Sequence, residues 1–236
     1  MAPEVIRVIN APSTMDLAHA QAQLGVPHGT AIIAEQQSAG RGTRGRQWSA
    51  GLGGLWLSVV TRPDRIDALE ALSLRIGLAL AALLEREFPS LPAIALKWPN
   101  DLMLGEGKLA GILCEARWSG GTCQWVVIGL GLNVANPLTD ALTGSATRLA
   151  DWVQGADPVR LAGPCVATIS EAARAAGPLS AAELNAFAAR DYLTGRRVTD
   201  PVAGTAAGIT AAGALRVHTD LGPVREILGG VVTTTG

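Results

Sequence analysis

Three arginines and three glycines are interleaved in residues 40–48, GRGTRGRQW. Glycine lets the backbone adopt positive φ and bring its N–H groups close to a ligand, and guanidinium groups match carboxylate and phosphate oxygens. We therefore expect Arg41, Arg44 and Arg46 to hold an anion. Trp48 follows them and could close over a flat ring system. No Gly-Lys-Ser/Thr follows, so this is not a Walker A loop, and on these residues alone a solvated arm that binds RNA is the alternative.

A second polar motif, KWPND, follows an apolar run at residues 93–97. Pro99 directs the chain out of the expected strand, so we expect Asn100 and Asp101 to be displayed on a turn. Together with Lys97 they could contact a phosphate, a polar group and a Mg²⁺ ion. The structural alternative is a turn in which Asn and Asp only cap a connection.

Two further segments are apolar strands interrupted by glycine. In GKLAGIL, residues 107–113, Lys108 stands at the strand start, and Gly111 leaves room for a ligand against the sheet. In IGLGLNV, Gly129 and Gly131 leave one strand face bare, although a bulged core strand explains this segment equally well. All four motifs together indicate a sheet face that holds a nucleotide's phosphates beside a small acid.

The four segments EQQSAGRGTRGRQW, LKWPNDLML, GKLAGIL and VIGLGLNV, in this order and at these separations, resemble the biotin protein ligases. The resemblance implies a biotin--[biotin carboxyl-carrier protein] ligase. Such an enzyme activates biotin with ATP and Mg²⁺ to biotinyl-5′-AMP, releases pyrophosphate, and then transfers biotin to a lysine of the biotin carboxyl carrier protein of acetyl-CoA carboxylase. A lipoate-attaching ligase of similar fold and a nucleic-acid-binding protein with a repressor role are the alternatives.

The resemblance also implies a role for each matched residue. Arg41, Lys97 and Lys108 would be catalytic, acting on phosphate and carboxylate oxygens. The biotin-binding residues would be Ser13, Thr14, Gln37, Gly40, Arg41, Trp56, Lys108 and Gly111, with Leu109 and Ile112 as apolar neighbours. The nucleotide-binding residues would be Arg44, Arg46, Trp48, Lys97, Asn100, Asp101, Gly129, Gly131 and Asn133, with Asp101 also a ligand of Mg²⁺.

Some positions are open to other interpretations or depart from the family. Ser13 and Thr14 are equally a helix N-cap. The three histidines match no catalytic position, and we expect ordinary surface or turn roles for them. Thr43 stands where members of this family often carry an arginine, so we expect this chain to retain its adenylate intermediate less tightly.

Composition favours a globular enzyme. The chain has 236 residues, of which 48% are hydrophobic and 17% charged, and its formal net charge is −1. This charge gives no general attraction to nucleic acid or anionic membranes. The start of the chain lacks a secretion signal and leaves no room for an amino-terminal DNA-binding module, so we expect a cytoplasmic enzyme, monomeric or homodimeric, with no DNA or membrane partner. The three cysteines lack metal-site spacing and are expected to be buried thiols.

The elements that must position these residues follow from hydrophobic periodicity. Strands are expected at residues 30–35, 55–61, 93–97, 109–115 and 124–134, with a buried helix at 67–88. Later helices should begin at Asp157, with a break or bend at Pro164, and at Ser180, the latter running to about residue 191. A glycine-punctuated tail favours short strands.

The expected fold is therefore α+β. The resemblance specifies a mixed, largely antiparallel sheet packed with helices, like the catalytic domain of class II synthetases. It also divides the chain into a catalytic domain, residues 1–189, and a small SH3-like β-barrel domain, residues 190–236.

Overall fold

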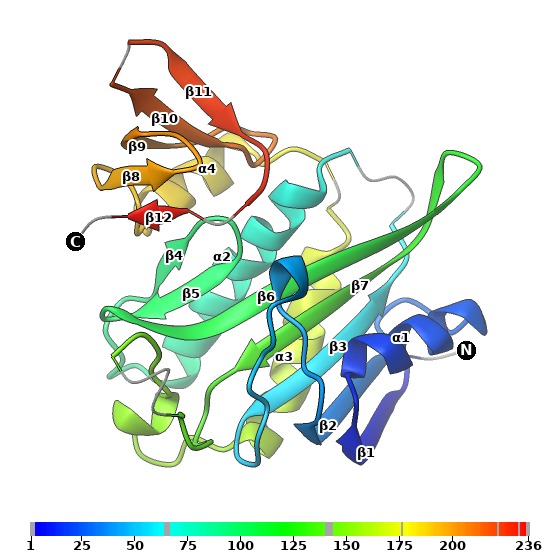
Figure 1. The fold of residues 1–236 in the computed structure, drawn as a ribbon. Helices are drawn as coiled ribbons and strands as arrows, with labels where there is room; N and C mark the ends of the chain where they lie inside the picture. Colours follow the sequence, from blue (N-terminus) through cyan, green and yellow to red (C-terminus); the bar gives the residue numbers. More distant parts are fainter. Residues whose placement is uncertain are drawn as a thin grey trace.

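The computed structural model describes residues 3–63, 67–139, 144–175, 177–220, 222–230 and 232–234, with Arg44 described in its backbone alone. A seven-stranded sheet forms its centre, in the order β1-β2-β3-β7-β6-β5-β4 (Figure 1). Its first pair, β1 and β2, is parallel and the other pairs are antiparallel. The strands are β1 (Val5–Ala11), β2 (Ala31–Gln37), β3 (Leu55–Thr61), β4 (Ala95–Lys97), β5 (Asp101–Leu104), β6 (Gly107–Ser119) and β7 (Thr122–Leu132).

A second, antiparallel sheet follows in the order β11-β10-β9-β8-β12. Its strands are β8 (Arg197–Asp200), β9 (Gly204–Ile209), β10 (Leu215–Thr219), β11 (Val224–Ile227) and β12 (Thr233–Thr234). The helices are α1 (Thr14–Gln23), α2 (Leu69–Glu87), α3 (Pro158–Ala172) and α4 (Ala181–Ala188), with 3₁₀ turns η1 (Thr43–Gly45) and η3 (Leu149–Asp151). The α+β fold expected from the sequence is confirmed.

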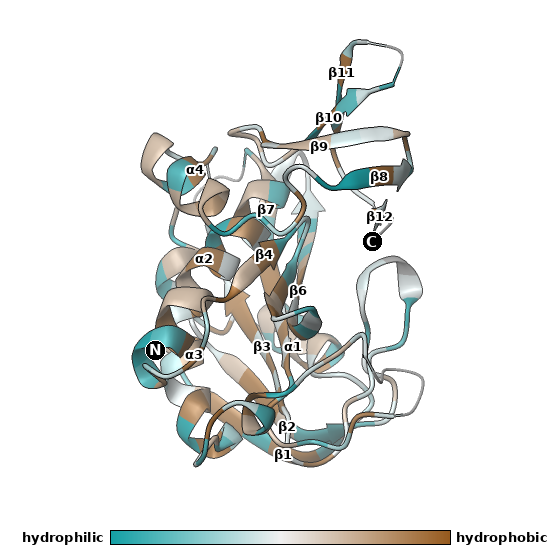
Figure 2. Cartoon of the chain, turned by 90° about the vertical axis from the view of Figure 1, so that its left-hand side faces the viewer, coloured by the Kyte–Doolittle hydropathy of each residue, from teal (hydrophilic) through white to brown (hydrophobic). Residues whose placement is uncertain are grey.

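The two faces of the large sheet are covered unequally. Successive residues of a strand point to opposite faces, so Val59 packs in the main core with α2 and α3, whereas Val60 packs under α1. Figure 2 shows hydrophobic stretches of the central strands beside α2 and α3. The shorter α1 covers only part of the other face, and the loop after β2 crosses in front of the rest (Figure 1).

The expected strands correspond to β2, β3, β4, β6 and β7, and the expected buried helix to α2. The strands β1 and β5 were not expected. The prediction that Asn100 and Asp101 both lie on a turn is correct for Asn100 and wrong for Asp101, which is the first residue of β5. Its pairing with Gly111 continues the sheet beyond the proline turn and half-buries the carboxylate.

The expected break at Pro164 is also wrong, because α3 continues through it. Residues on one side of this helix, such as Leu161 and Ile169, are buried in the core, and that packing opposes the loss of one backbone hydrogen bond. Gly163 precedes the proline and has no Cβ to clash with its ring. The expected caps are confirmed: Asp157 accepts from the Val159 N–H, and Ser180 forms a capping box with Glu183.

The second sheet packs on the first part of the chain. The indole N–H of Trp98, in the KWPND turn, donates to the Gly213 carbonyl at 2.8 Å. Gly213 has φ +91°, and a Cβ there would lie 2.6 Å from the backbone nitrogen of Ala71 in α2. Leu215 and Val217 of β10 belong to the main hydrophobic core. The two sheets therefore share one core.

Two expectations from composition concern burial and membranes. Cys123 and Cys165 are buried, as expected, while Cys114 is half-buried, and all three are free thiols. Within the described ranges, no helix is long and apolar enough to cross a membrane.

Candidate active site

A cavity of about 380 Å³ lies on the face of the large sheet left open by α1. One row of residues in register crosses four strands beneath it: Trp56, Gly131, Gly111 and Asp101. Cross-strand partners point to the same face, so the two glycines form a bare strip between a tryptophan and a carboxylate.

Lys108 reaches this face because of a β-bulge. Strand alternation would place Lys108 and Gly111, three residues apart, on opposite faces. Leu102 pairs with Ala110 but Met103 pairs with Lys108, so β6 has one extra residue here. The bulge turns Lys108 to the same side as Asp101, and its Nζ lies 2.6 Å from Asp101 Oδ1.

Residues 40–48 fold as a hairpin-like loop over the cavity, with η1 at the tip. Gly42 N donates to Arg46 O at 2.7 Å, and Trp48 N donates to Gly40 O at 2.8 Å. A Cβ on Gly40 would lie 2.6 Å from the Trp48 carbonyl oxygen. Glycine is thus required there by a close approach within the loop itself.

Trp48 lies on the glycine strip. A Cβ would come within 3.0 Å of the indole at Gly111 and within 2.6 Å at Gly131. The ring meets Trp56 edge-on at 6.4 Å between centroids, and Lys108 Nζ lies 5.0 Å from its centroid. The indole nitrogen of Trp48 is buried and has no hydrogen-bond partner among the described residues. The site therefore presents an aromatic surface beside a cation and an unused donor.

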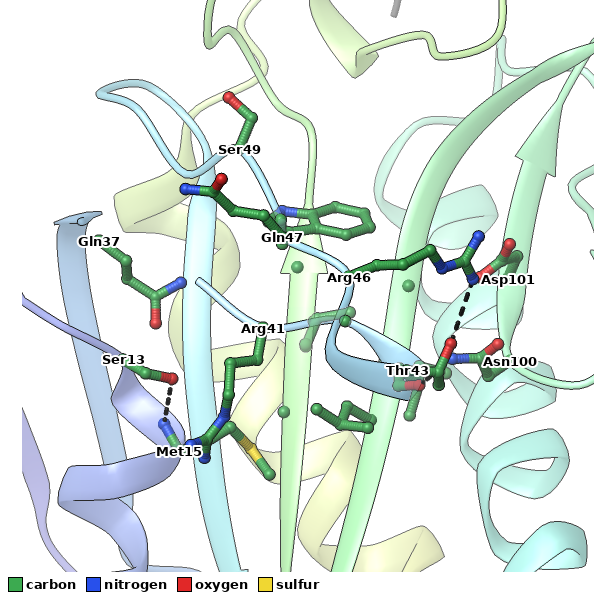
Figure 3. Close-up of a pocket in the computed structure, with 18 of the residues that line it drawn as sticks. Ser13, Met15, Gln37, Arg41, Thr43, Arg46, Gln47, Ser49, Asn100 and Asp101 are labelled. Atoms are coloured by element: carbon green, nitrogen blue, oxygen red, sulfur yellow. Dashed lines mark hydrogen bonds between the residues drawn. The ribbon is translucent and has the colours of Figure 1, made fainter. Parts of the chain in front are cut away.

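At the Asp101 end, charged and amide groups gather. Asp101 Oδ1 is buried, and Lys108 Nζ lies 2.6 Å from it, so the two side chains form an ion pair. Asn100 Nδ2 donates to Ile112 O at 2.5 Å, which ties the turn to β6. Arg46 points across the cavity toward Asp101 (Figure 3), and its Nη2 donates to Thr43 Oγ1 at 3.2 Å.

The opposite end of the cavity lies at the start of α1. Ser13 is the N-cap, and its hydroxyl accepts from Met15 N at 3.3 Å (Figure 3). Gln37 Oε1 accepts from Thr14 N at 2.6 Å, and the hydroxyls of Thr14 and Ser58 are 2.8 Å apart. Ser13 is therefore both a helix cap and a cavity residue. This end offers neutral polar groups beside the Arg41 guanidinium (Figure 3), whereas the other end offers Lys108, Asp101 and Arg46.

Most of the residues singled out in the sequence meet at this cavity. Those that line it are Ser13, Thr14, Gln37, Arg41, Arg46, Trp48, Asn100, Asp101, Lys108, Gly111, Gly129, Gly131 and Asn133, and also Ile112. The lining does not include Gly40, Trp56, Leu109 or Lys97, and the side chain of Arg44 lies outside the described part. Trp56 is fully buried at the edge of the site and donates to Gly51 O at 2.8 Å.

Lys97 lies at the junction with the second sheet. Its Nζ is 5.7 Å from the centroid of the Tyr192 ring, whose other close cation is Arg196 at 4.0 Å. Burial and the hydrogen bond to Glu106 raise the pKa of the Tyr192 phenol. A phosphate contact by Lys97 stays a prediction.

Gly42 and Thr43, which belong to the expected loop, also line the cavity. Several other lining residues were not expected from the sequence: Met15, Gln47, Ser49, Leu57, Ser58, Leu113, Leu130, Ser145 and Ala146. Met15 accounts for the glycine at position 129, because a Cβ on Gly129 would lie 2.7 Å from the Met15 sulfur. Alternation along β3 puts Ser58 on the face of Trp56, but a lone serine in an apolar strand gave no sign of a site.

Comparison with known proteins defines the class. The profile of the Biotin/lipoate A/B protein ligase family matches residues 5–133, more than half of the chain, and the chain belongs to this family. It is 41% identical over 119 residues to the biotin--[acetyl-CoA-carboxylase] ligase of Paracoccus denitrificans; the match covers 49% of each chain. The chain thus spans about half the length of that curated relative, and 43% of the matched Bacillus subtilis bifunctional ligase/repressor BirA.

Two solved structures extend the likeness to nearly the whole chain. Biotin protein ligase from Aquifex aeolicus in complex with biotin and ATP has a TM-score of 0.81 at 25% identity, covering 98% of both chains. Biotin protein ligase from Leishmania major in complex with biotinyl-5-AMP has a TM-score of 0.65 at 25% identity, covering 96% of this chain and 99% of that one.

Proposed function

We propose that this chain is an ATP-dependent biotin protein ligase. It forms biotinyl-5′-AMP and pyrophosphate from biotin and ATP, and then transfers biotin to a lysine of the biotin carboxyl carrier protein of acetyl-CoA carboxylase. The observation that carries the proposal is the arrangement of the cavity: the neutral hydrogen-bonding groups of Ser13, Thr14 and Gln37 lie at one end beside the Arg41 guanidinium, Lys108, Asp101 and Arg46 lie at the other end, and Trp48 lies between them. A substrate with an uncharged head and an ionised carboxylate fits this order.

The chemistry needs cations and positioning more than a base. A carboxylic acid is already ionised near neutral pH, so the enzyme must bring two anions together and stabilise charge on the transferred phosphoryl group. Lys108 would contact the substrate carboxylate and the new acyl-phosphate bond. Arg41 and Arg46 extend from one loop to the two ends of the cavity (Figure 3), where they would hold opposite ends of the adenylate.

The proposed substrates divide the cavity between them. Ser13, Thr14 and Gln37 would bind the ureido head of biotin, and Gly111 lets the ligand approach β6. Trp48, Asn100 and Asn133 would bind the nucleotide, with Gly129 and Gly131 keeping β7 clear. The residues assigned by resemblance that do not line the cavity, Gly40, Trp56 and Lys97, would act from its edge.

A Mg²⁺ ion would serve to neutralise phosphate charge. The described residues include no group of three His, Cys, Asp or Glu side chains that could hold a metal ion. Asp101 offers a single carboxylate, and its Oδ1 already lies 2.6 Å from Lys108 Nζ. Such a donor set fits Mg²⁺ held mainly by substrate phosphates and water, as this ion commonly is.

The proposed division of labour places catalysis in residues 1–189. Residues 190–236, which contain the second sheet, would form the SH3-like domain. Its strand pattern supports this, and the carrier protein is supported by the name of the Paracoccus relative.

Isotope exchange between pyrophosphate and ATP tests the first step. Exchange is expected with biotin and Mg²⁺, and not with lipoate in place of biotin; exchange with lipoate alone would point to the other branch of the family. Failure to form biotinyl-5′-AMP from biotin and Mg²⁺·ATP would refute the proposal. Mass spectrometry of a biotin carboxyl carrier protein, before and after incubation, tests the transfer step.

A further inference from the structure

A chain of polar contacts outside the cavity ends on Arg41. Glu115, on β6, accepts from His19 Nε2 with its Oε2 at 3.0 Å, and the same oxygen lies 3.6 Å from Arg41 Nη2. The other ring nitrogen of His19, Nδ1, accepts a hydrogen bond from Trp125 Nε1 at 3.0 Å; His19 lies on α1. Asp16 Oδ1 contacts Arg41 Nη1 at 2.6 Å. Two carboxylates therefore contact this one arginine, and a histidine contacts one of the two carboxylates.

The chemistry of the groups fixes the direction of these bonds. An indole nitrogen only donates, so Nδ1 of His19 must be the acceptor and Nε2 must carry the proton. His19 is thus held as the neutral imidazole that donates to Glu115. Its side chain is 16% exposed, against 37% for Glu115, so the histidine is the better fixed of the two. A surface glutamate on its own would adopt several rotamers.

We infer that His19 is a positioning residue for Arg41, acting through Glu115. The Trp125–His19 bond fixes the imidazole, the imidazole fixes the Glu115 carboxylate, and that carboxylate with Asp16 holds the guanidinium at the cavity end near Met15. Arg41 is the second residue of the glycine-rich loop, whose backbone leaves it many conformations. Anchoring this guanidinium to α1 and β6 lowers the entropy lost when the loop binds an anion.

The catalytic consequence rests on the proposed function, since Arg41 matters for adenylate formation only in a ligase. The test compares two substitutions of one residue. Asn in place of His19 can put its amide near the Nδ1 position but cannot reach Glu115, whereas Gln can put an N–H where Nε2 was. We expect His19→Asn to lower kcat/KM for biotin in pyrophosphate exchange about tenfold, and His19→Gln to stay within about threefold of the original.

A double-mutant cycle separates positioning from a general effect on folding. In an Arg41→Ala background, His19→Asn should cause no further loss beyond about twofold, because the group it positions is gone. His218→Asn, on β10, is the matched control and should leave exchange unchanged. A His19→Asn enzyme with unchanged kinetics, or with an equal loss in both backgrounds, would overturn the inference.

A second readout needs no enzymatic activity. Phenylglyoxal modifies accessible guanidinium groups, and peptide mass spectrometry gives the rate at Arg41. We expect that rate to rise severalfold in His19→Asn and to stay the same in His19→Gln, with equal melting temperatures as the check on folding. Equal rates in all three proteins would refute positioning, whereas a protein that makes no biotinyl-5′-AMP but shows the expected rates would refute only the proposed function.

Discussion

Two glycines of β7, Gly129 and Gly131, lie against different side chains, and this distinguishes the two ends of the site. A Cβ on Gly131 would meet the rigid indole of Trp48 at 2.6 Å, while one on Gly129 would meet the flexible thioether of Met15 at 2.7 Å. The flexible end of a methionine side chain can change rotamer at lower cost than a rigid indole, although Met15 is buried and Trp48 is half-buried.

We therefore expect Gly131→Ala to raise the KM for ATP about tenfold with a smaller effect on biotin. The resemblance assigns Gly129 to the nucleotide, but Gly129 lies against Met15 at the α1 end of the cavity, so we expect Gly129→Ala to change the KM for biotin more than that for ATP. Steady-state pyrophosphate exchange with each substrate varied in turn measures both. Equal effects of the two substitutions on both substrates would contradict this division of the cavity.

Thr43 is the loop residue at which the resemblance to biotin protein ligases implies an arginine in other members. Its hydroxyl accepts from Arg46 Nη2, so it orients an arginine without adding a cation of its own. We expect Thr43→Arg to slow the release of biotinyl-5′-AMP about tenfold, because a further guanidinium could pair with the phosphate. Rapid gel filtration of the preformed complex measures release, Thr43→Gln is the uncharged control, and equal release by all three proteins would count against the prediction.

At the scale of elements, α3 tolerates a proline in its interior. Pro164 has no backbone N–H to donate to the preceding turn, yet α3 continues through it to Ala172. We expect Pro164→Ala to raise the free energy of unfolding by about 1 kcal/mol or more. This is the net effect, because the loss of proline also raises the conformational entropy of the unfolded chain, which opposes the gain. Urea unfolding measures it, and Gly163→Ala is the companion: it should destabilise, because a Cβ before proline disfavours the helical conformation. A stabilising Gly163→Ala would refute this account.

An ion pair between Glu85 of α2 and Arg190, just after α4, links these two parts of the chain and depends on the ionisation of Glu85. Glu85 accepts from Arg190 at 2.5 and 2.7 Å and from Ile94 N at 2.8 Å. The hydrogen bond from Arg190 holds the pKa of the Glu85 carboxyl below its ordinary value of 4.5, against the opposing effect of burial.

A lowered folded-state pKa contributes stability above the unfolded value, which is lost as the pH falls through the folded value. We expect Glu85→Gln to cost about 2 kcal/mol at pH 7 and progressively less below pH 4.5. Urea unfolding at pH 7, 5, 4 and 3 measures the difference, with the exposed Glu171→Gln as control. A cost that does not shrink with acid would show that Glu85 stabilises the fold by packing alone.

At the scale of the whole molecule, the two sheets share a hydrophobic core, and Trp98 bonds to Gly213 across them. We expect the full chain to unfold in one transition by both far-UV circular dichroism and tryptophan fluorescence. Residues 1–189 alone should bind a hydrophobic dye and unfold at lower urea, because removal of the second sheet uncovers α2 and Trp98. Two separate transitions in the full chain would instead support independent domains.

Much of this architecture could be predicted from local patterns. The periodicity of α2, the apolar runs of β2, β3, β6 and β7, and the caps at Asp157 and Ser180 depend on residues close in sequence. The errors have non-local causes. Asp101 became part of a strand because β6 lies beside it, and α3 passes Pro164 because the core packs against it.

By itself, the sequence determined which residue types are available for chemistry: the arginines and glycines of the loop, Lys108, Asp101 and the bare face of β7. Its motifs also determined the family. Only the tertiary structure decided that Lys108 faces Asp101, since that depends on one extra residue in β6. It likewise decided that Trp48 rests on Gly111 and Gly131, and that His19 stands behind Arg41. The contacts of Trp48 and His19 join residues far apart along the chain, and that of Lys108 depends on the register of two paired strands. Strand register and helix packing set the geometry of all of them, and no local pattern encodes it.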